Sequence, residues 1–301
     1  MYRYSRTFVG SIRACILDWS GTTVDKYAIA PVEAVCKLFE NEKIPITKEE
    51  ARGPMGIRKD LHIRAILQNE NVNQRWLEQH VTKTITKSVL GSVPWPQKIV
   101  KPSEKNVEEL FEKFVPLQEE VLKNYTKLIP GVIGSTHWMQ HTMGIKIGLT
   151  TGFMNSMSEI LLESAIKQGF VPDCVVSGDD VEHGSRPKPF MVYKNMEMLN
   201  AWPIESIVKV DDTAEGVSEG LAAGCWTVGV SRYSTYMNID SLEHEESLSE
   251  EEMKERHEYS KNKLKQAGAH FVVDAVYDLP SVISIINDRM KHGACSYYLN
   301  I

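Results

Sequence analysis

Residues 16–23 read ILDWSGTT, an apolar run that ends at Asp18 and opens into a turn containing Gly21. Helical patterns separate most of the similar runs that follow, and buried strands that alternate with helices predict an α/β fold with a doubly wound parallel sheet. The short apolar runs that we predict to be strands are Ala14–Leu17, Ile145–Leu149, Cys174–Val176, Ile207–Val210, Trp226–Val230 and Phe271–Val273.

A long helical stretch separates the first predicted strand from the second. Apolar residues recur at helical spacing over residues 27–127, and strand character is scarce there. We therefore predict a helical cap domain over residues 27–127, inserted into a Rossmann-like core of residues 1–26 and 128–301. Within the insert, Pro116 is expected to bend or break a helix, and residues 91–103 are expected to form a proline-rich loop.

The composition excludes several classes of protein. The chain has 301 residues, of which 42% are hydrophobic and 25% are charged, with a formal net charge of −6. Such values are typical of a globular protein and exclude disorder as its main state. The acidic balance argues against a nucleic-acid partner bound through a basic surface. No stretch approaches about 18 consecutive apolar residues, so we expect no membrane partner.

Cysteine usage and the charged segments indicate where the protein resides. Five dispersed cysteines include no CxxC pair, which predicts reduced thiols and a cytoplasmic location. Residues 1–17 hold three arginines and no acid, a faint likeness to a transit peptide. Because residues 12–17 read as a core strand, a cleavable segment would be short. The acidic run Glu243–Glu255 is expected to be a solvated helix face.

Polar side chains suited to phosphoryl chemistry follow the predicted strands. Asp18 ends the first strand, where a carboxylate can attack phosphorus and the N–H groups of the turn can hold phosphoryl oxygens. Thr151 and Gly152 follow the second strand, where a small hydroxyl beside glycine suits one phosphoryl oxygen. Because ligands bind outside the carboxyl ends of parallel strands, we expect these groups to meet.

Two later segments complete this ordered set. Residues 184–189 read GSRPKP, in which flanking prolines stiffen a turn that aims Arg186 at an anion, whereas Lys188 is expected to face solvent. Asp211 and Asp212 end a further strand, and carboxylates there are hard oxygen ligands suited to Mg²⁺. A purely structural role does not readily explain four such polar segments in this order along the chain.

The ordered set resembles the haloacid dehalogenase superfamily of phosphotransfer enzymes, and the helical insert resembles its cap domain. Most phosphatases of that superfamily have a general acid/base aspartate two residues after the nucleophile, where this chain has Ser20. Because the leaving oxygen of a phosphate monoester usually needs a proton, this difference disfavours ordinary phosphatase chemistry.

Residues 51–65, ARGPMGIRKDLHIRA, are similar to the cap-domain lysine motif of the phosphonoacetaldehyde hydrolase family. The turn from Asp18 to Asp25 resembles that family too, including its small residue at position 20. Further similarity is found at residues 150–152, 224–230 and 268–271, and the resemblance spans about residues 12–282.

The resemblance implies a magnesium site and two chemical roles. Asp18 is implied to be the nucleophile and a ligand of Mg²⁺, with the backbone carbonyl of Ser20 and the carboxylate of Asp212 as the other protein ligands. Lys59 is implied to form an imine with the substrate. Groups implied to bind the substrate or to lie beside Lys59 are Thr151, Gly152, Arg186, Met55 and His62.

The reaction implied is hydrolysis of phosphonoacetaldehyde, a small phosphonate, to acetaldehyde and phosphate by a homodimer. Two alternatives stay open: a Mg²⁺-dependent phosphatase of a small phosphorylated metabolite, and a non-catalytic descendant that binds a phosphorylated ligand or a protein partner. For His62, a proton relay through water and a packed or capping role both stay open. For Lys59, the alternative is an ordinary surface lysine.

Three positions depart from the family pattern. Asp211 stands where glycine is common, and Gly216 stands where the family has an aspartate. Either Asp211 or Glu215 replaces the missing carboxylate, or the chain binds its metal more weakly. Phe153 stands where tyrosine is frequent, which removes one hydroxyl. These differences bear on substrate preference and rate more than on reaction type.

Overall fold

A computed structural model describes residues 8–85 and 102–293 of the chain, with the side chains of residues 81–85 excepted. Six strands form one sheet in the order β3-β2-β1-β4-β5-β6, and every neighbouring pair is parallel. The strands are β1 Ala14–Asp18, β2 Lys146–Thr150, β3 Cys174–Val176, β4 Ile207–Asp211, β5 Trp226–Val230 and β6 Phe271–Val273. The predicted fold class is confirmed.

The register of the central strands brings their carboxyl ends level. β1 lies between β2 and β4, with Asp18 opposite Thr150 and Leu17 opposite Val210. Both faces of β1 are covered, which is why its sequence reads as a continuous apolar run rather than an alternating one. The loops after these three strands therefore open at one edge of the sheet.

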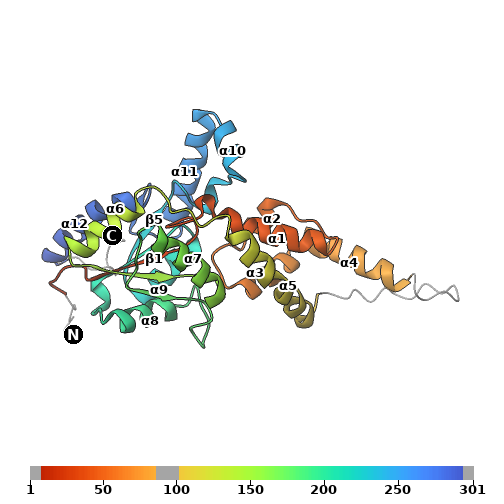
Figure 1. Ribbon diagram of the computed structural model, residues 1–301, viewed down its shortest axis with the longest axis horizontal. Helices are drawn as coiled ribbons and strands as arrows, with labels where there is room; N and C mark the ends of the chain where they lie inside the picture. Colours follow the sequence, from red (N-terminus) through yellow and green to blue (C-terminus); the bar gives the residue numbers. More distant parts are fainter. Residues whose placement is uncertain (1–7, 86–101, 294–301) are drawn as a thin grey trace, which may run out of the picture.

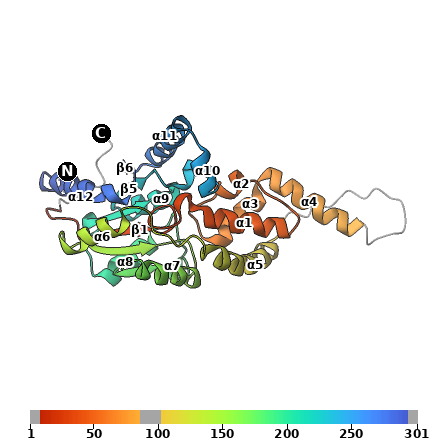
Figure 2. The same cartoon turned by 45° about the horizontal axis from the view of Figure 1, so that its top comes forward.

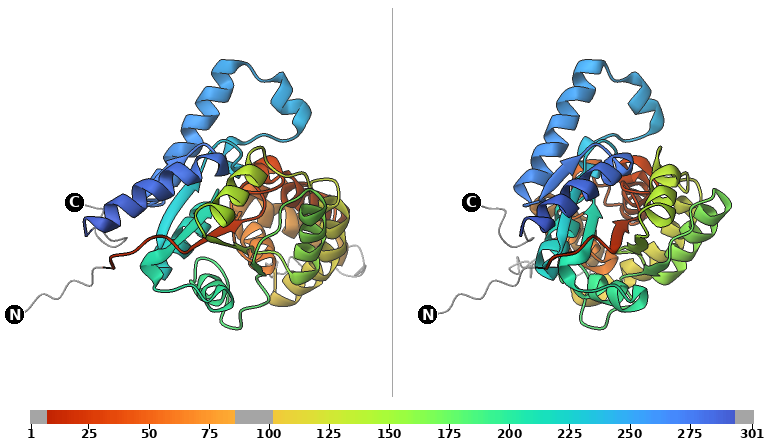
Figure 3. Two further views of the ribbon diagram at one scale, coloured as in Figure 1. Left: turned by 60° about the vertical axis from the view of Figure 1, so that its left-hand side comes forward. Right: turned by 90° about the vertical axis from the view of Figure 1, so that its left-hand side faces the viewer.

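Helices cover both faces of the sheet (Figure 3). Because successive side chains of a strand point to opposite faces, Ala14 and Ile16 join a cluster with α8 and α9, whereas Cys15 and Leu17 join the large cluster beneath α6, α7 and α12. The helices of this part are α6 Val132–His141, α7 Asn155–Lys167, α8 Phe190–Leu199, α9 Ala214–Ala223, α10 Leu242–Ser247, α11 Glu250–Gln266 and α12 Leu279–Lys291.

The first five described α-helices after β1 extend to one side of the sheet (Figures 1 and 2). α1 packs along α5, and α3 packs against both α4 and α5. Each described helix of the chain is too short or too polar to span a bilayer. The helices of the insert are α1 Ile29–Asn41, α2 Lys48–Arg52, α3 Lys59–Gln68, α4 Glu70–Ile85 and α5 Glu104–Leu122.

Of the two outcomes expected at Pro116, a bend or a break, the break is wrong, because α5 continues through this residue. Proline removes one hydrogen bond to the carbonyl of Glu112, four residues earlier, but both residues lie on the exposed face, where water can bond that carbonyl. Phe114 and Val121 on the opposite face are buried and hold the helix in place. Most of the predicted loop at residues 91–103 lies outside the described residues.

The acidic run Glu243–Glu255 spans two helices rather than one. α10 and α11 project from the sheet (Figures 1 and 3), and most of their acids are exposed as expected. Glu245 is an exception, since it accepts a hydrogen bond of 2.6 Å from the hydroxyl of Tyr27 and pairs with Lys26 at 3.3 Å. This part of the projection therefore contacts the segment that leads from β1 into the insert.

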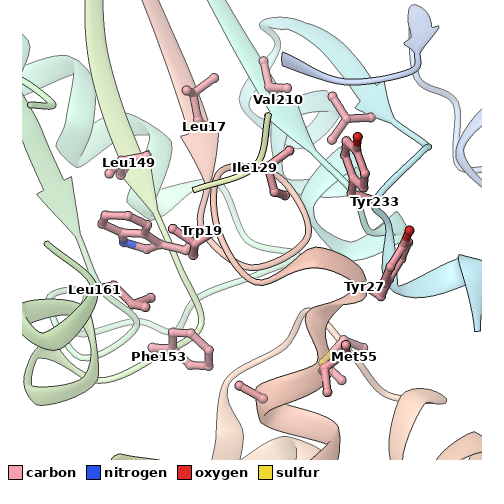
Figure 4. Packing of buried hydrophobic residues seen from close by; sticks show 14 of the residues in the cluster. Leu17, Trp19, Tyr27, Met55, Ile129, Leu149, Phe153, Leu161, Val210 and Tyr233 are labelled. Atoms are coloured by element: carbon pink, nitrogen blue, oxygen red, sulfur yellow. The ribbon is translucent and has the colours of Figure 1, made fainter. Parts of the chain in front are cut away.

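The insert also contacts the core through charge and through apolar packing. Arg52 of α2 is buried, and its guanidinium donates to the Asp240 carboxylate at 2.6 Å and to the carbonyl of Ile239 at 2.7 Å. Met55 of the insert belongs to the same buried cluster as Phe153, from the loop after β2 (Figure 4). The loop at residues 53–58 thus lies directly over the carboxyl ends of the strands.

Candidate active site

Asp18 and Arg186 form a buried ion pair at the end of β1. Arg186 Nη2 donates to Asp18 Oδ1 at 2.6 Å, and the two residues are 3% and 5% exposed. Burial raises the pKa of Asp18 above its ordinary value, and the nearby Arg186 opposes this shift. Lys188 in the same turn is exposed and donates to a backbone carbonyl, so Arg186 is the cation that this turn directs inward.

Arg186 is held by more than Asp18. Its Nε donates to Glu219 Oε2 at 3.1 Å, and its Nη2 donates to the hydroxyl of Thr150 at 3.0 Å and lies 3.2 Å from Asp211 Oδ2. A guanidinium with partners on several sides has little freedom to rotate. The geometry therefore fixes its position relative to Asp18.

Lys209 and Glu219 belong to this network, and the sequence analysis missed both. The Nζ of Lys209, within β4, donates to Thr150 Oγ1 at 2.7 Å and to Asp211 Oδ2 at 2.8 Å, and it lies 3.6 Å from Glu219. One signal was present in the sequence, because a lysine inside an apolar strand needs a buried anionic partner. Glu219 on α9 carried no comparable signal.

Three aspartates converge where β1 and β4 end. One carboxylate oxygen of each of Asp18, Asp211 and Asp212 lies within 4.8 Å of the others, and all three side chains are buried. Asp212 Oδ2 accepts from the backbone N–H of Thr235 at 2.9 Å, while its Oδ1 is buried without a partner among the described residues. Burial, together with Asp18 and Asp211, raises the pKa of Asp212 well above its ordinary value.

This cluster has the properties that a divalent cation needs. Clustered buried carboxylates repel one another, and an orphaned buried oxygen is costly unless something binds it. Hard oxygen ligands suit Mg²⁺, and Ser20 lines the same cavity as Asp18 and Asp212. The residues present therefore fit the metal that the sequence predicted.

Lys59 begins α3 and lies inside the cavity rather than on the surface. It is only 4% exposed, its Nζ is 4.0 Å from Met55 Sδ, and the ring centre of Phe153 is 5.1 Å away. Burial lowers the pKa of Lys59 to about 8, with Arg186 acting in the same direction and Asp18 against it. An amine of this kind is partly neutral near neutral pH and can act as a nucleophile.

His62 lies one turn after Lys59 and packs inside the insert. Its Nε2 is 2.7 Å from the carbonyl of Ala51, which links α3 to α2. Burial lowers the pKa of His62 to about 3, so the ring is neutral and its Nε2–H donates to that carbonyl. His62 is absent from the described lining of the cavity, which favours the packed interpretation over a relay.

The insert and the core approach each other closely beside the cavity. A Cβ on Gly152 would lie 2.8 Å from the carbonyl oxygen of Ile57, and one on Gly56, whose φ is +99°, would lie 2.8 Å from Thr213 Oγ1. These approaches require glycine. Thr151 also lines the cavity, where its hydroxyl accepts from the N–H of Phe153 at 3.1 Å. Residues of two distant parts of the sequence thus enclose one small space.

Related proteins share most of the chain. A phosphonoacetaldehyde hydrolase of Syntrophobacter fumaroxidans is 35% identical over 96% of this chain and 97% of its own length. One of Bacillus cytotoxicus is 37% identical over 92% and 97%. The crystal structure of a phosphonoacetaldehyde hydrolase-like protein from Oleispira antarctica is 34% identical, covers 98% of this chain and 99% of its own, and superposes with a TM-score of 0.86.

More distant structures share the fold alone, among them a β-phosphoglucomutase from Clostridium difficile with 18% identity, 92% and 98% coverage and a TM-score of 0.62. The model of the haloacid dehalogenase-like hydrolases matches residues 15–230, which hold the aspartates at the ends of β1 and β4 together with the insert. The chain therefore belongs to the haloacid dehalogenase-like hydrolases and, within them, to the phosphonoacetaldehyde hydrolase family.

Proposed function

We propose that the protein hydrolyses the phosphorus–carbon bond of phosphonoacetaldehyde, giving acetaldehyde and phosphate. The observation that carries this proposal is the position of Lys59, a buried amine with a lowered pKa that lines the same small cavity as Asp18 and Arg186. An ordinary phosphatase has no use for such an amine. The names of the relatives support the same substrate.

Lys59 solves the difficulty of a carbon leaving group. Its neutral amine adds to the aldehyde carbon and expels water, which gives an imine that gains a proton. The protonated imine accepts the electron pair of the phosphorus–carbon bond, so the leaving carbon departs as a neutral enamine. The enamine then takes a proton at carbon, and water releases acetaldehyde and the free amine of Lys59.

Asp18 receives the phosphoryl group in the same step. Its carboxylate oxygen forms a bond to phosphorus as the bond to carbon breaks, and water later hydrolyses the aspartyl phosphate to phosphate. Arg186 offsets the negative charge of the phosphonyl oxygens, and the Thr151 hydroxyl and the Gly152 backbone bind the same group. The network around Arg186 holds that cation in place during both steps.

Asp18, Asp212 and the backbone carbonyl of Ser20 would hold Mg²⁺. When bound, the ion lowers the repulsion between the carboxylate and the phosphonyl oxygens. The insert, proposed to be a cap domain over residues 27–127, excludes water from the imine and lowers the pKa of Lys59 by burying it. Met55 packs beside the amine, and the neutral ring of His62 fixes the start of the helix that carries it.

We also propose a homodimer in a reducing compartment such as the cytoplasm. The family resemblance carries the dimer, since the exposed apolar faces expected on the insert are not found there: the large apolar side chains that are exposed among the described residues, such as Ile133, Trp138 and Ile166, lie outside it. The cysteines support the second point, since all four in the described part, Cys15, Cys36, Cys174 and Cys225, are free thiols. Light scattering at working concentration tests the dimer, and a monomer would contradict it.

Imine trapping tests the proposed function directly. The protein is incubated with phosphonoacetaldehyde and borohydride, phosphate release is followed in parallel without borohydride, and the peptides are then mapped. We expect inactivation and one added two-carbon group on Lys59. Lys59→Arg should lose both trapping and hydrolysis, because guanidinium stays protonated and cannot form an imine.

Lys37→Arg is the matched control, since Lys37 is an exposed lysine of the same insert that pairs with Glu120. It should behave like the unchanged protein in both assays. Normal cleavage of phosphonoacetaldehyde by Lys59→Arg would overturn the mechanism. Phosphate release from monoesters alone would favour the phosphatase alternative, and turnover of neither substrate class would favour the non-catalytic one.

A further inference from the structure

We infer that Asp211 is a positioning residue of the proposed active site and that Gly216 is glycine in order to leave room for it. This inference rests on the proposed function only for its link to Mg²⁺. It gives a role to Asp211, the third buried carboxylate of the site. It also explains why α9 contains Gly216, at which neither a turn nor a positive φ requires glycine.

The steric relation between the two residues is direct. Gly216 lies in the first turn of α9, and a Cβ built on it would lie 1.9 Å from the carboxyl carbon of Asp211. Real Cβ atoms do not approach another atom so closely, so a side chain at 216 and the observed position of Asp211 exclude each other. A glycine inside a helix lowers its stability, which indicates that the space serves another purpose.

Asp211 cannot move aside cheaply, because protein donors bind both of its oxygens. Oδ1 accepts from the backbone N–H of Thr213 at 3.0 Å and from its hydroxyl at 2.7 Å, while Oδ2 accepts from Lys209 at 2.8 Å. Arg186 Nη2 lies 3.2 Å from the same Oδ2. These four donors hold the carboxylate in one position and offset its charge.

The charge of the site explains why a third carboxylate belongs there. The buried ionisable groups that meet around Arg186 are four acids and two bases, which give a net formal charge of −2 when all are ionised. One divalent cation balances that charge. With its oxygens already bonded to protein donors, Asp211 acts by orienting Arg186 and Lys209 and by adding its charge beside Asp18 and Asp212.

Two measurements that need no substrate test the inference: one for the space beside Gly216 and one for the charge of the Asp211 carboxylate. The variants are Gly216→Ala, Asp211→Gly, the double variant Asp211→Gly/Gly216→Ala, and the double variant Asp211→Gly/Gly216→Asp, which moves the carboxylate to the helix. Calorimetry measures Mg²⁺ binding, and thermal unfolding measures stability. Gly134→Ala is the matched control, because Gly134 is a helical glycine with no atom within 4 Å of its Cβ position.

Gly216→Ala should lower the unfolding midpoint by about 5 °C, and Asp211→Gly should weaken Mg²⁺ binding at least about tenfold. Asp211→Gly removes a partner of the buried Lys209, so it should lower the midpoint by itself. In that background Gly216→Ala should lower the midpoint no further and Mg²⁺ binding should stay weak, whereas Asp211→Gly/Gly216→Asp should restore binding. Gly134→Ala should leave both unchanged or raise the midpoint.

The inference is overturned if Gly216→Ala unfolds and binds Mg²⁺ like the unchanged protein, if the effects of Gly216→Ala and Asp211→Gly on the midpoint simply add, or if Asp211→Gly/Gly216→Asp does not recover binding. Imine trapping on Lys59 is scored separately. If the variants fail to show the expected midpoints and Mg²⁺ binding while the unchanged protein cleaves phosphonoacetaldehyde normally, the inference alone is refuted. If the variants behave as expected but the protein does not cleave phosphonoacetaldehyde, the proposed function alone is refuted.

Discussion

The Nζ of Lys59 lies 5.1 Å from the centre of the Phe153 ring, so a residue of the insert and a residue of the loop after β2 meet inside the cavity. The ring face attracts a protonated amine, but the loss of water around the buried amine costs more. Burial, aided by Arg186 and opposed by Asp18 and Asp25, lowers the pKa of Lys59 to about 8. This value makes about a tenth of the amine neutral at pH 7.

The rate of imine formation should follow the titration of Lys59. Because only the neutral amine adds to the aldehyde, the borohydride inactivation rate should rise about fivefold from pH 7 to pH 8 and then level off near pH 9. His62, whose pKa burial lowers to about 3, should add no further inflection above pH 5. A rate that keeps rising about tenfold per pH unit up to pH 10 would show an ordinary lysine instead.

Asp18→Asn should separate the two chemical steps. The amide cannot form the acyl phosphate, so phosphate release should fall at least about 10³-fold. Imine formation depends on Lys59, which another element carries, so mass spectrometry should still find a trapped adduct on Lys59. Because the phosphorus–carbon bond stays intact in this variant, the two-carbon group should still carry its phosphono group. Loss of trapping together with hydrolysis would mean that Asp18 is needed to bind the aldehyde or to fold the site.

Removal of divalent cations should abolish phosphate release and leave imine trapping intact. Asp18 and Asp212 offer only oxygen ligands, so Mg²⁺ should restore activity after chelation, and a softer metal should not be required. The measurement compares both assays in excess chelator before and after Mg²⁺ is added. Full hydrolysis in excess chelator would contradict the assignment of a metal site.

Arg52→Ala should loosen the contact between insert and core. Arg52 is buried but Asp240 is partly exposed, so we expect a loss of about 1–2 kcal/mol in the free energy of unfolding and a raised KM. Arg75→Ala is a suitable control, because Arg75 pairs with Glu50 within the insert. An effect of Arg75→Ala on KM as large as that of Arg52→Ala would contradict this role.

The sheet was accessible from the sequence because its strands are buried on both faces. Such strands read as short apolar runs, and all six runs are strands of the structure, with ends that differ by at most one residue. The break at Pro116 was wrongly expected because the effect of a proline depends on whether the carbonyl that loses its hydrogen bond, here that of Glu112, faces water. That property belongs to the packed molecule and not to the local sequence.

The site was accessible only where polar residues follow strands. Asp18, Thr151 and Asp212 stand at such positions, whereas Glu219 acts from the middle of a helix and is recognised only by its contact with Arg186. The sequence left open whether Asp211 or Glu215 replaces the carboxylate that is missing at position 216. Only the structure shows that a Cβ at Gly216, in the first turn of α9, would overlap the carboxylate of Asp211 at the end of β4.

The central position of β1 also governs the order of assembly during synthesis. β1 is made first but pairs with β2, which begins at Lys146, and with β4, which begins at Ile207. The insert, in which α5 packs on α1 and α3, can condense while β1 still lacks both neighbours, because all of its helices are made before β2. Chains truncated near residue 140 and released from the ribosome should therefore hold a protease-resistant insert beside an unprotected first strand. The insert that buries Lys59 would therefore fold before the sheet that positions Asp18 has formed.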